Sequence, residues 1–203
     1  AGGWSGVKLY FMLGLPTETD EDVLGIADLA RKVYFAWREY TPNPKRGVRI
    51  TVSTSWFVPK PHTAFQWEAQ IPVEEYQSIT YNWHDPQTSY LEAIFSRGDR
   101  RLADVLEWAW QHGAKFDSWS EYFDYQRWMD ALEACGLDGD FYAHRERPRS
   151  EVFPWCRIDP MVTPAFLWHE RELCYQSQTT PDCRTRCSGC GANRLLKGGV
   201  CNG

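Results

Sequence analysis

Hydrophobic and polar positions in the first sixty residues follow two successive periodicities. Residues 7–13 form an almost continuous apolar run, which is typical of a buried strand in a parallel sheet. Thr19 or Asp20 can then cap a helix whose apolar residues recur at helical spacing as far as Val33. Residues 48–54 alternate and are rich in β-branched side chains, so they predict a second strand. Strand, helix and strand in this order predict a right-handed unit with two parallel strands.

The pattern changes after the second strand. Prolines within residues 57–62 exclude regular structure there, and residues 78–83 have the character of a third strand. Helical periodicity follows, and Gly113 and Gly136 stand where C-terminal caps belong. The expected helices cover residues 88–96, 100–112, 119–134 and 165–175, with a charged loop at 145–160.

These patterns predict an α/β fold, namely the C-terminal portion of a partial βα barrel followed by a helical extension and a cysteine-rich tail. The expected boundaries are 1–86 for the barrel portion, 87–175 for the helical extension and 176–203 for the tail. The chain begins with Ala-Gly-Gly shortly before its first strand and has no initiator Met. We therefore expect it to be a fragment of a larger protein whose earlier part is missing.

The amino-acid composition disfavours some classes of function for this chain and favours others. The 203 residues carry a formal net charge of −5, so nucleic-acid binding through a broad basic surface is not indicated. Aromatic residues make up 15% of the chain and can build a substantial core. We find neither a signal peptide nor a run of about 18 apolar residues, and so expect a cytoplasmic protein without a membrane partner.

The cysteines do not resemble a secreted disulfide framework, because they number seven and four of them crowd into the tail. Cys183, Cys187 and Cys190 have the spacing C-x3-C-x2-C, which lets three thiolates surround one iron–sulfur cluster or one zinc ion. Cys201 or Cys174 can supply a fourth ligand. The spacing fits both metals equally, and free thiols in an unstructured tail are the alternative.

The same spacing holds the catalytic cluster of radical S-adenosylmethionine enzymes. In those enzymes the cysteine loop follows the first barrel strand, and the rest of the barrel comes after it. Only thirteen residues follow Cys190, which are too few to build a barrel. We therefore expect the tail cysteines to form an auxiliary site.

Two loops that follow strands are further candidates for ligand binding. Gly14 allows a ligand to approach the backbone closely at the carboxyl end of the first strand, where parallel barrels place their active sites. The alternative is a plain strand–turn–helix joint with capping residues. Lys60 and His62 follow the second strand and can meet an anionic ligand, or they belong to a proline-stiffened loop with solvated charges. His84 can be a proton donor or a core histidine.

Several of these segments together resemble a known family. The run from Lys8 to Asp22 resembles the Gly-hydrophobic-Pro-x-Glu-Thr strand and loop of radical S-adenosylmethionine proteins. The chain also resembles one subfamily of these proteins in four segments that follow one another in order, namely residues 57–67, 96–101, 116–119 and 182–184. This subfamily contains large cobalamin-binding-domain proteins whose substrate is unassigned. The resemblance covers almost the whole chain.

The resemblance implies an iron–sulfur enzyme that cleaves S-adenosylmethionine reductively and abstracts hydrogen from an unknown small-molecule or macromolecular substrate. It places Gly14, Leu15, Pro16 and Glu18 near the S-adenosylmethionine pocket. A cobalamin-binding region and the loop for a catalytic [4Fe–4S] cluster belong to the missing N-terminal region of the same protein. We expect this chain alone to be inactive for that reason. The competing hypothesis is a zinc-knuckle module that binds RNA or a protein partner, with Cys183, Cys187, Cys190 and Cys201 as ligands.

Overall fold

The computed structural model describes residues 6–72 and 85–195, and its chain separates into two compact units. The first unit contains β1 (Gly6–Leu13), α1 (Asp20–Tyr40) and β2 (Arg49–Trp56). The second unit contains Val58–Pro72 and the chain from Tyr90 onwards. The segment Val58–Pro72 thus belongs with the helices and the tail, whereas the predicted boundary at residue 86 places it with the strands.

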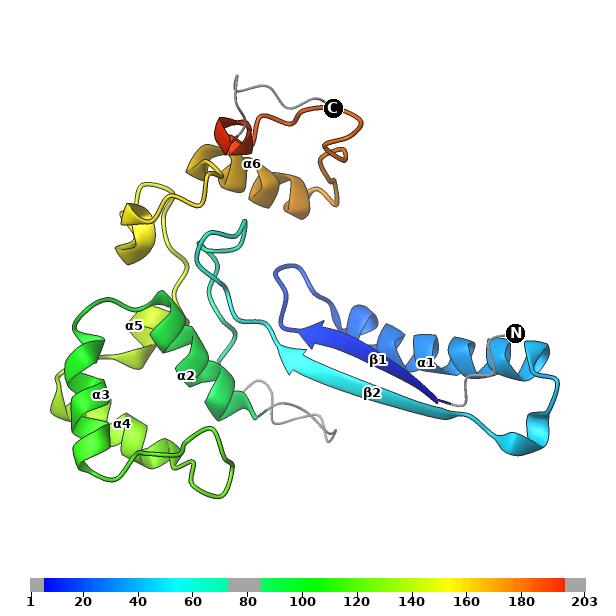
Figure 1. The fold of residues 1–203 in the computed structure, drawn as a ribbon, viewed down its shortest axis with the longest axis horizontal. Helices are drawn as coiled ribbons and strands as arrows, with labels where there is room; N and C mark the ends of the chain where they lie inside the picture. Colours follow the sequence, from blue (N-terminus) through cyan, green and yellow to red (C-terminus); the bar gives the residue numbers. More distant parts are fainter. Residues whose placement is uncertain (1–5, 73–84, 196–203) are drawn as a thin grey trace. The chain divides into compact units, whose positions relative to one another are not determined.

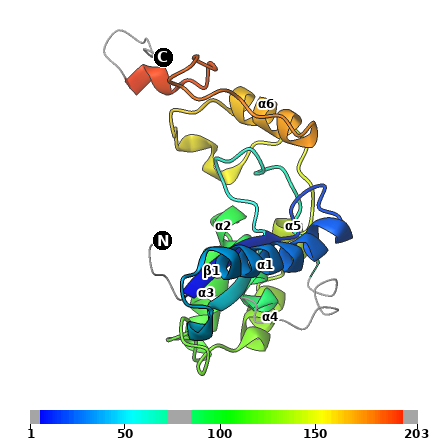
Figure 2. The same ribbon diagram turned by 90° about the vertical axis from the view of Figure 1, so that its right-hand side faces the viewer.

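The first unit has the predicted strand–helix–strand topology. β1 and β2 pair in parallel, in a register that runs from Gly6 opposite Arg49 to Leu13 opposite Trp56. The amide of Phe57 donates to the carbonyl of Leu13 at 2.8 Å and so continues the pairing past β2. α1 lies along one face of this sheet, as both views show (Figures 1 and 2).

A capping box fixes the start of α1. The Thr19 hydroxyl accepts a hydrogen bond from the Asp22 amide at 3.3 Å, and the Asp22 carboxylate accepts one from the Thr19 amide at 2.9 Å. This reciprocal pair satisfies two donors that a helix N-terminus otherwise leaves unpaired. Asp20, Glu21 and Asp22 also place negative charge against the positive end of the helix dipole.

The prediction that the first strand is buried holds for Leu13 alone, because the other residues of β1 are half-buried on one face and exposed on the other. Tyr10 is 71% exposed and Met12 is 45% exposed, and α1 contains no buried residue. Within the described ranges the sheet has two strands, and α1 covers one of its faces. Apolar side chains on the other face therefore meet solvent in this chain. The complete barrel remains a prediction.

The second unit confirms the four predicted helices, with different ends. Turns with backbone hydrogen bonds from Trp119 to Phe116 and from Tyr122 to Trp119 replace the expected start of the third helix. Asp124 caps this helix instead, because its carboxylate accepts from the Arg127 amide. A short helix after Asp138 was not predicted. The helices are α2 (Pro86–Arg97), α3 (Leu102–Gln111), α4 (Tyr125–Ala134), α5 (Gly139–Ala143) and α6 (Pro164–Tyr175).

Val58–Pro72 lacks helix and strand but lies at the centre of the second unit. Trp67 is 2% exposed and packs in one cluster with Phe153, Trp155 and Leu167. The buried guanidinium of Arg97 donates to the carbonyls of Glu68 and Ala143, at 2.7 and 3.0 Å. These bonds satisfy backbone groups that no ladder or helix serves. The predicted third strand at 78–83, together with His84 and Cys201, lies outside the described residues.

Candidate cofactor and metal sites

The loop after β1 closes on itself through Glu18. The Glu18 carboxylate accepts a hydrogen bond from the Gly14 amide at 2.6 Å, and the Glu18 amide donates to the carbonyl of Leu15 at 3.0 Å. Gly14 has a φ of 82°, a conformation in which a side chain is strained, so glycine is required at this bend. The four predicted cofactor-binding residues, Gly14, Leu15, Pro16 and Glu18, therefore form one turn at the carboxyl end of β1.

The electrostatics of this turn centre on a partly buried carboxyl group. Burial raises the pKa of Glu18 above its usual value, and the nearby Asp22 carboxylate raises it further. The hydrogen bond from Gly14 opposes both effects because it favours the charged form. A partly desolvated carboxylate of this kind interacts favourably with a cationic group such as an ammonium. The turn thus offers one acidic acceptor beside backbone at the edge of a parallel sheet.

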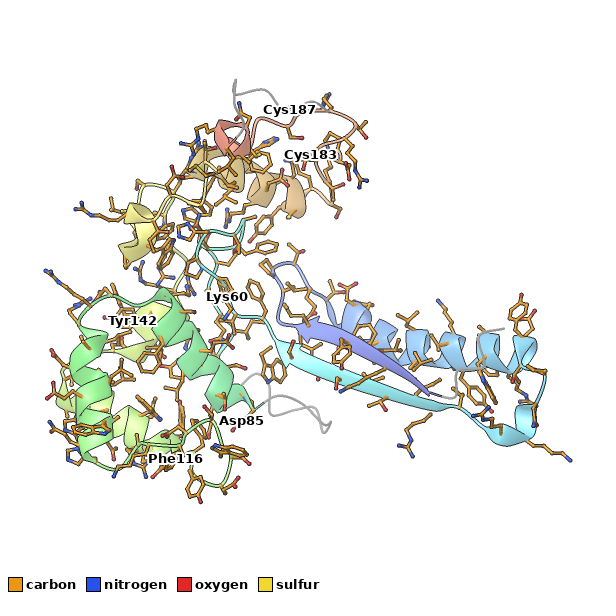
Figure 3. The ribbon with its side chains drawn as sticks, viewed as in Figure 1. Lys60, Asp85, Phe116, Tyr142, Cys183 and Cys187 are labelled. Atoms are coloured by element: carbon orange, nitrogen blue, oxygen red, sulfur yellow. The ribbon has the colours of Figure 1, made fainter. Side chains whose placement is uncertain are left out.

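Among the described residues of the tail, the cysteines do not form a metal site. Cys183 and Cys187 are exposed on the segment that follows α6, where Figure 3 labels both. The Asp182 carboxylate organises this turn, since it accepts from the Arg184 amide at 2.8 Å and pairs with the Arg184 guanidinium. Throughout residues 6–72 and 85–195, no three His, Cys, Asp or Glu side chains gather closely enough to hold one metal ion.

Cys190 differs from the other two because the fold holds its backbone. Its carbonyl accepts a hydrogen bond from the amide of Thr163, the residue that caps α6, at 2.9 Å. Gly191 lies so close to this cap that an added Cβ would approach the carbonyl oxygen of Met161 to 3.0 Å. A metal held by the three thiols therefore requires Cys183 and Cys187 to move toward an anchored Cys190. Their thiolates suit both a cluster and zinc chemically.

Of the two candidates for a fourth metal ligand, the structure describes Cys174. Burial, together with the nearby Glu170 carboxylate, raises the pKa of the Cys174 thiol. Because the thiolate is the form that binds metal, this environment disfavours Cys174 as a ligand. Cys201 lies beyond the described residues.

The proline-containing loop after β2 serves mainly to build the second unit. Lys60, labelled in Figure 3, forms an ion pair with Glu92 of α2. Glu68 and Gln66 of the same segment are buried, at 6% and 3% exposure. The segment is thus partly buried, although the paired side chains of Lys60 and Glu92 are 42% and 48% exposed. An anionic ligand at Lys60 has a competitor in Glu92. His62 lines a pocket of the second unit.

Sequence reasoning missed a cluster of buried polar side chains around the segment. Glu68 forms an ion pair with Arg171 and accepts a hydrogen bond from the Tyr175 hydroxyl at 2.8 Å. Arg147 is 3% exposed and donates to the carbonyl of Tyr142 at 2.9 Å. Burial of an arginine leaves no periodic signal. The nearest clue is Glu68 next to Trp67 in a segment otherwise poor in charge.

Comparisons with known proteins give little functional information. The chain is 30% identical over 120 residues to an uncharacterized protein of the archaeon Methanocaldococcus jannaschii. The match covers 53% of this chain and 24% of that protein, so the chain spans about a quarter of the relative's length. No protein-family profile matches the chain, and no solved structure matches it. Within the part of the chain that the structure describes, no helix is both long and apolar enough to cross a membrane.

Proposed function

We propose that this chain is the rear part of a radical S-adenosylmethionine enzyme, in which β1 and β2 are two barrel strands and the Gly14–Glu18 turn faces the cofactor. One observation carries the proposal. The turn stands at the carboxyl end of a parallel strand pair, the end at which βα barrels hold their ligands. The motif resemblance described for the sequence supports it independently.

Two further observations agree with a barrel completed by other parts of a longer protein. The sheet exposes apolar side chains such as Tyr10 and Met12, which additional strands and helices can cover. The matched archaeal protein is also about four times longer than the aligned portion, since that portion covers 24% of it. The catalytic cluster loop and the cobalamin-binding region belong to the proposed remainder. Substrate binding by that remainder in the cytoplasm, where thiols stay reduced, is part of the same proposal.

The residues of the turn suit the proposed cofactor. In the bound state, the cluster and S-adenosylmethionine together supply hydrogen abstraction from the substrate. The Glu18 carboxylate can accept a hydrogen bond from the ammonium group of the cofactor, and Gly14 permits the cofactor to approach the end of the strand closely. Leu15 and Pro16 are half-buried and contribute apolar surface beside it. The work of this part of the chain is thus to orient the cofactor and to keep water away from it.

The test compares two carboxylates in the protein that contains the upstream region. Glu18→Gln should reduce formation of 5′-deoxyadenosine at least about tenfold, because the amide cannot pair with an ammonium group. Glu21→Gln removes an equal charge from the first turn of α1 and should leave the rate unchanged. This chain alone, reconstituted with iron and sulfide, should give no product. Product from the chain alone, or equal rates in the two variants, contradicts the proposal.

The proposed role of the tail is to hold an auxiliary iron–sulfur cluster through Cys183, Cys187, Cys190 and Cys201. Anaerobic reconstitution should give a brown protein with iron and acid-labile sulfide. Cys187→Ala should lose both, whereas Cys135→Ala, which removes a half-buried thiol outside the tail, should keep them. A colourless protein with one zinc favours the zinc-knuckle module instead, and a protein with neither metal overturns both functions of the tail.

A further inference from the structure

A pocket of about 350 Å³ lies within the second unit, and its lining includes neither the residues of the Gly14–Glu18 turn nor Cys183, Cys187 and Cys190. Its lining is mostly apolar and comes from the core cluster around Trp155 and from the chain between α5 and α6. The rings of Phe153 and Trp155 stack with centroids 4.6 Å apart and planes 14° apart, so each ring holds the other in place beside the pocket. The apolar lining includes Phe153, Trp155, Ile158, Val162 and Leu167.

Gln66 fixes two parts of this pocket relative to each other. Its side-chain oxygen accepts a hydrogen bond from the indole N–H of Trp155 at 2.9 Å and one from the backbone amide of His62 at 3.2 Å. The residue is 3% exposed, so neither bond competes with bulk water. The pocket is therefore formed before any ligand arrives, which lowers the entropy cost of binding.

His62 supplies the polar group of the pocket. Its backbone has a φ of 60°, which is uncommon for a residue with a side chain. The Nε2 atom of its imidazole is buried and has no hydrogen-bond partner among the described residues. Buried polar atoms are almost always paired, and strained backbone concentrates at binding sites. Both observations at one residue point to a ligand that completes the hydrogen bond.

The remaining polar groups set the charge of the ligand. Arg194 and Asp159 line the pocket and pair with each other, with two nitrogen–oxygen distances of 3.2 and 3.3 Å. Their charges cancel, and neither an unpaired cation nor an unpaired anion stands among the described residues that line the pocket. An ionic ligand would therefore lose its hydration without compensation. A neutral ligand avoids this penalty.

We propose that this pocket binds a neutral, planar heteroaromatic molecule of one or two rings, whose N–H or O–H group donates to His62 Nε2 while its ring makes a stacked or edge-on contact with the Trp155–Phe153 pair. Aromatic rings favour such stacked contacts, and a two-ring molecule fits within 350 Å³. The proposal involves neither the S-adenosylmethionine turn nor the tail metal. Its failure leaves the proposed function untouched.

The first test uses indole and N-methylindole as a matched pair of probes, measured by ligand-observed NMR with the full chain. Indole should bind about fivefold more tightly, because N-methylindole lacks the donor for His62. His62→Gly removes the imidazole and accepts the positive φ without strain. In this variant the two probes should bind equally. Equal binding of both probes to the unaltered chain, or no binding of either, overturns the proposal.

The second test locates the probe through a thiol. Cys156 lines the pocket and is exposed, whereas Cys174 is exposed on α6 and does not line it. Saturating indole should slow alkylation of Cys156 at least about threefold and leave Cys174 unaffected, as followed by peptide mass spectrometry. Cys156→Trp should fill the pocket from its rim and abolish indole binding. Protection of both thiols alike, or of neither, shows that indole binds elsewhere and overturns the assignment.

Discussion

Arg97 shows how one side chain can organise a segment that has no regular structure. Its guanidinium is 1% exposed and donates to the carbonyls of Glu68 and Ala143, which are 75 residues apart in the chain and so belong to different segments. Arginine suits this position because its planar group offers five donors in fixed directions. The residue therefore replaces the hydrogen-bonded ladder that the prolines of the segment exclude.

We expect Arg97→Met to lower the free energy of unfolding of the second unit by about 3 kcal/mol, because the Glu68 carbonyl then loses its buried donor and the Ala143 carbonyl keeps only the amide of Gln70. Urea titration followed by tryptophan fluorescence measures this loss. Arg101→Met is the matched control, since its guanidinium pairs with Asp99 at the surface. The control should leave the urea midpoint nearly unchanged. Similar midpoints for both variants would show that the backbone bonds of Arg97 contribute little.

Glu151 makes the stability of the second unit depend on pH. Two hydrogen bonds from the Arg145 guanidinium, at 2.6 and 2.7 Å, lower the pKa of this carboxyl, and Arg147 lowers it further. A carboxyl whose pKa is lower in the folded state stabilises the fold above its unfolded pKa, near 4.5. This stabilisation is lost as the pH falls through the folded pKa.

The corresponding experiment compares Glu151→Gln with Glu121→Gln, which alters an exposed carboxylate. At pH 7 the Glu151 variant should be the less stable of the two in thermal unfolding. The difference should shrink as the pH falls below 4.5 and then through the lower folded pKa, at which the wild-type carboxyl is protonated and also loses its pairing. A difference that stays constant down to pH 2 would exclude the ion pair as its cause.

Side chains with local partners could be predicted from the sequence, whereas those with distant partners could not. The Thr19 cap and the bend at Gly14 follow from neighbouring residues, and the structure confirms that both stand where the pattern placed them. Arg97 reads in the sequence as an ordinary charged residue at a helix end. Its burial depends on carbonyls brought to it by tertiary structure, and no spacing in the sequence reveals them.

At the scale of elements, α5 packs against α2 at the closest distance that the side chains allow. A Cβ on Gly139 would overlap the Tyr90 hydroxyl and approach Ile94 Cδ1 to 2.9 Å. Neither neighbour can move easily, because Ile94 is fully buried and the Tyr90 hydroxyl donates to Asp140 at 2.6 Å. The short helix therefore needs glycine at its first residue for packing reasons.

Gly139→Ala should consequently destabilise the second unit by about 1–3 kcal/mol through overpacking. Gly25→Ala provides the opposite case, because nothing lies within 4 Å of the added Cβ in the middle of α1. That substitution should stabilise α1 by about 0.5–1 kcal/mol through helix propensity. Amide hydrogen exchange resolved by helix measures both effects. Stabilisation by alanine at both positions would contradict the close contact at Gly139.

Helices and strands in which apolar residues recur at a regular spacing could be predicted from the sequence. Segments whose conformation depends on tertiary contacts could not. α1, α3 and α6 follow from apolar spacing, and the structure confirms them to within two residues at their starts. The helix α5 has five residues, too few to show a period. The buried segment Val58–Pro72 was read as a loop because its prolines exclude regular structure, although exclusion of regular structure does not imply exposure.

At the scale of the whole molecule, the first unit exposes several large apolar side chains. Tyr10, Leu24 and Phe35 are each more than half exposed on β1 and α1. Large exposed apolar patches mark surfaces that another part of a protein covers. We therefore expect this chain alone to self-associate as its concentration rises, and to bind a hydrophobic dye.

Light scattering and dye fluorescence measure this expectation. The double variant Tyr10→Lys and Phe35→Lys should scatter less and bind less dye than the unaltered chain, because both changes fall on the exposed apolar surface. Lys substitution at Trp110 and Phe116 is the matched control on the second unit, where both rings are also exposed. An equal decrease in both double variants would show that the first unit is not the source of association.

The central position of Val58–Pro72 also determines when the second unit can form during translation. Gln66 can accept its hydrogen bond from Trp155 only after the ribosome has added 89 further residues. At about 5–20 residues per second this delay lasts roughly 5 to 20 seconds. Throughout that interval Trp67 lacks the partners that cover it in the finished fold. A nascent chain of this protein therefore emerges with Trp67 uncovered, and the segment around this side chain is a natural target for a ribosome-associated chaperone.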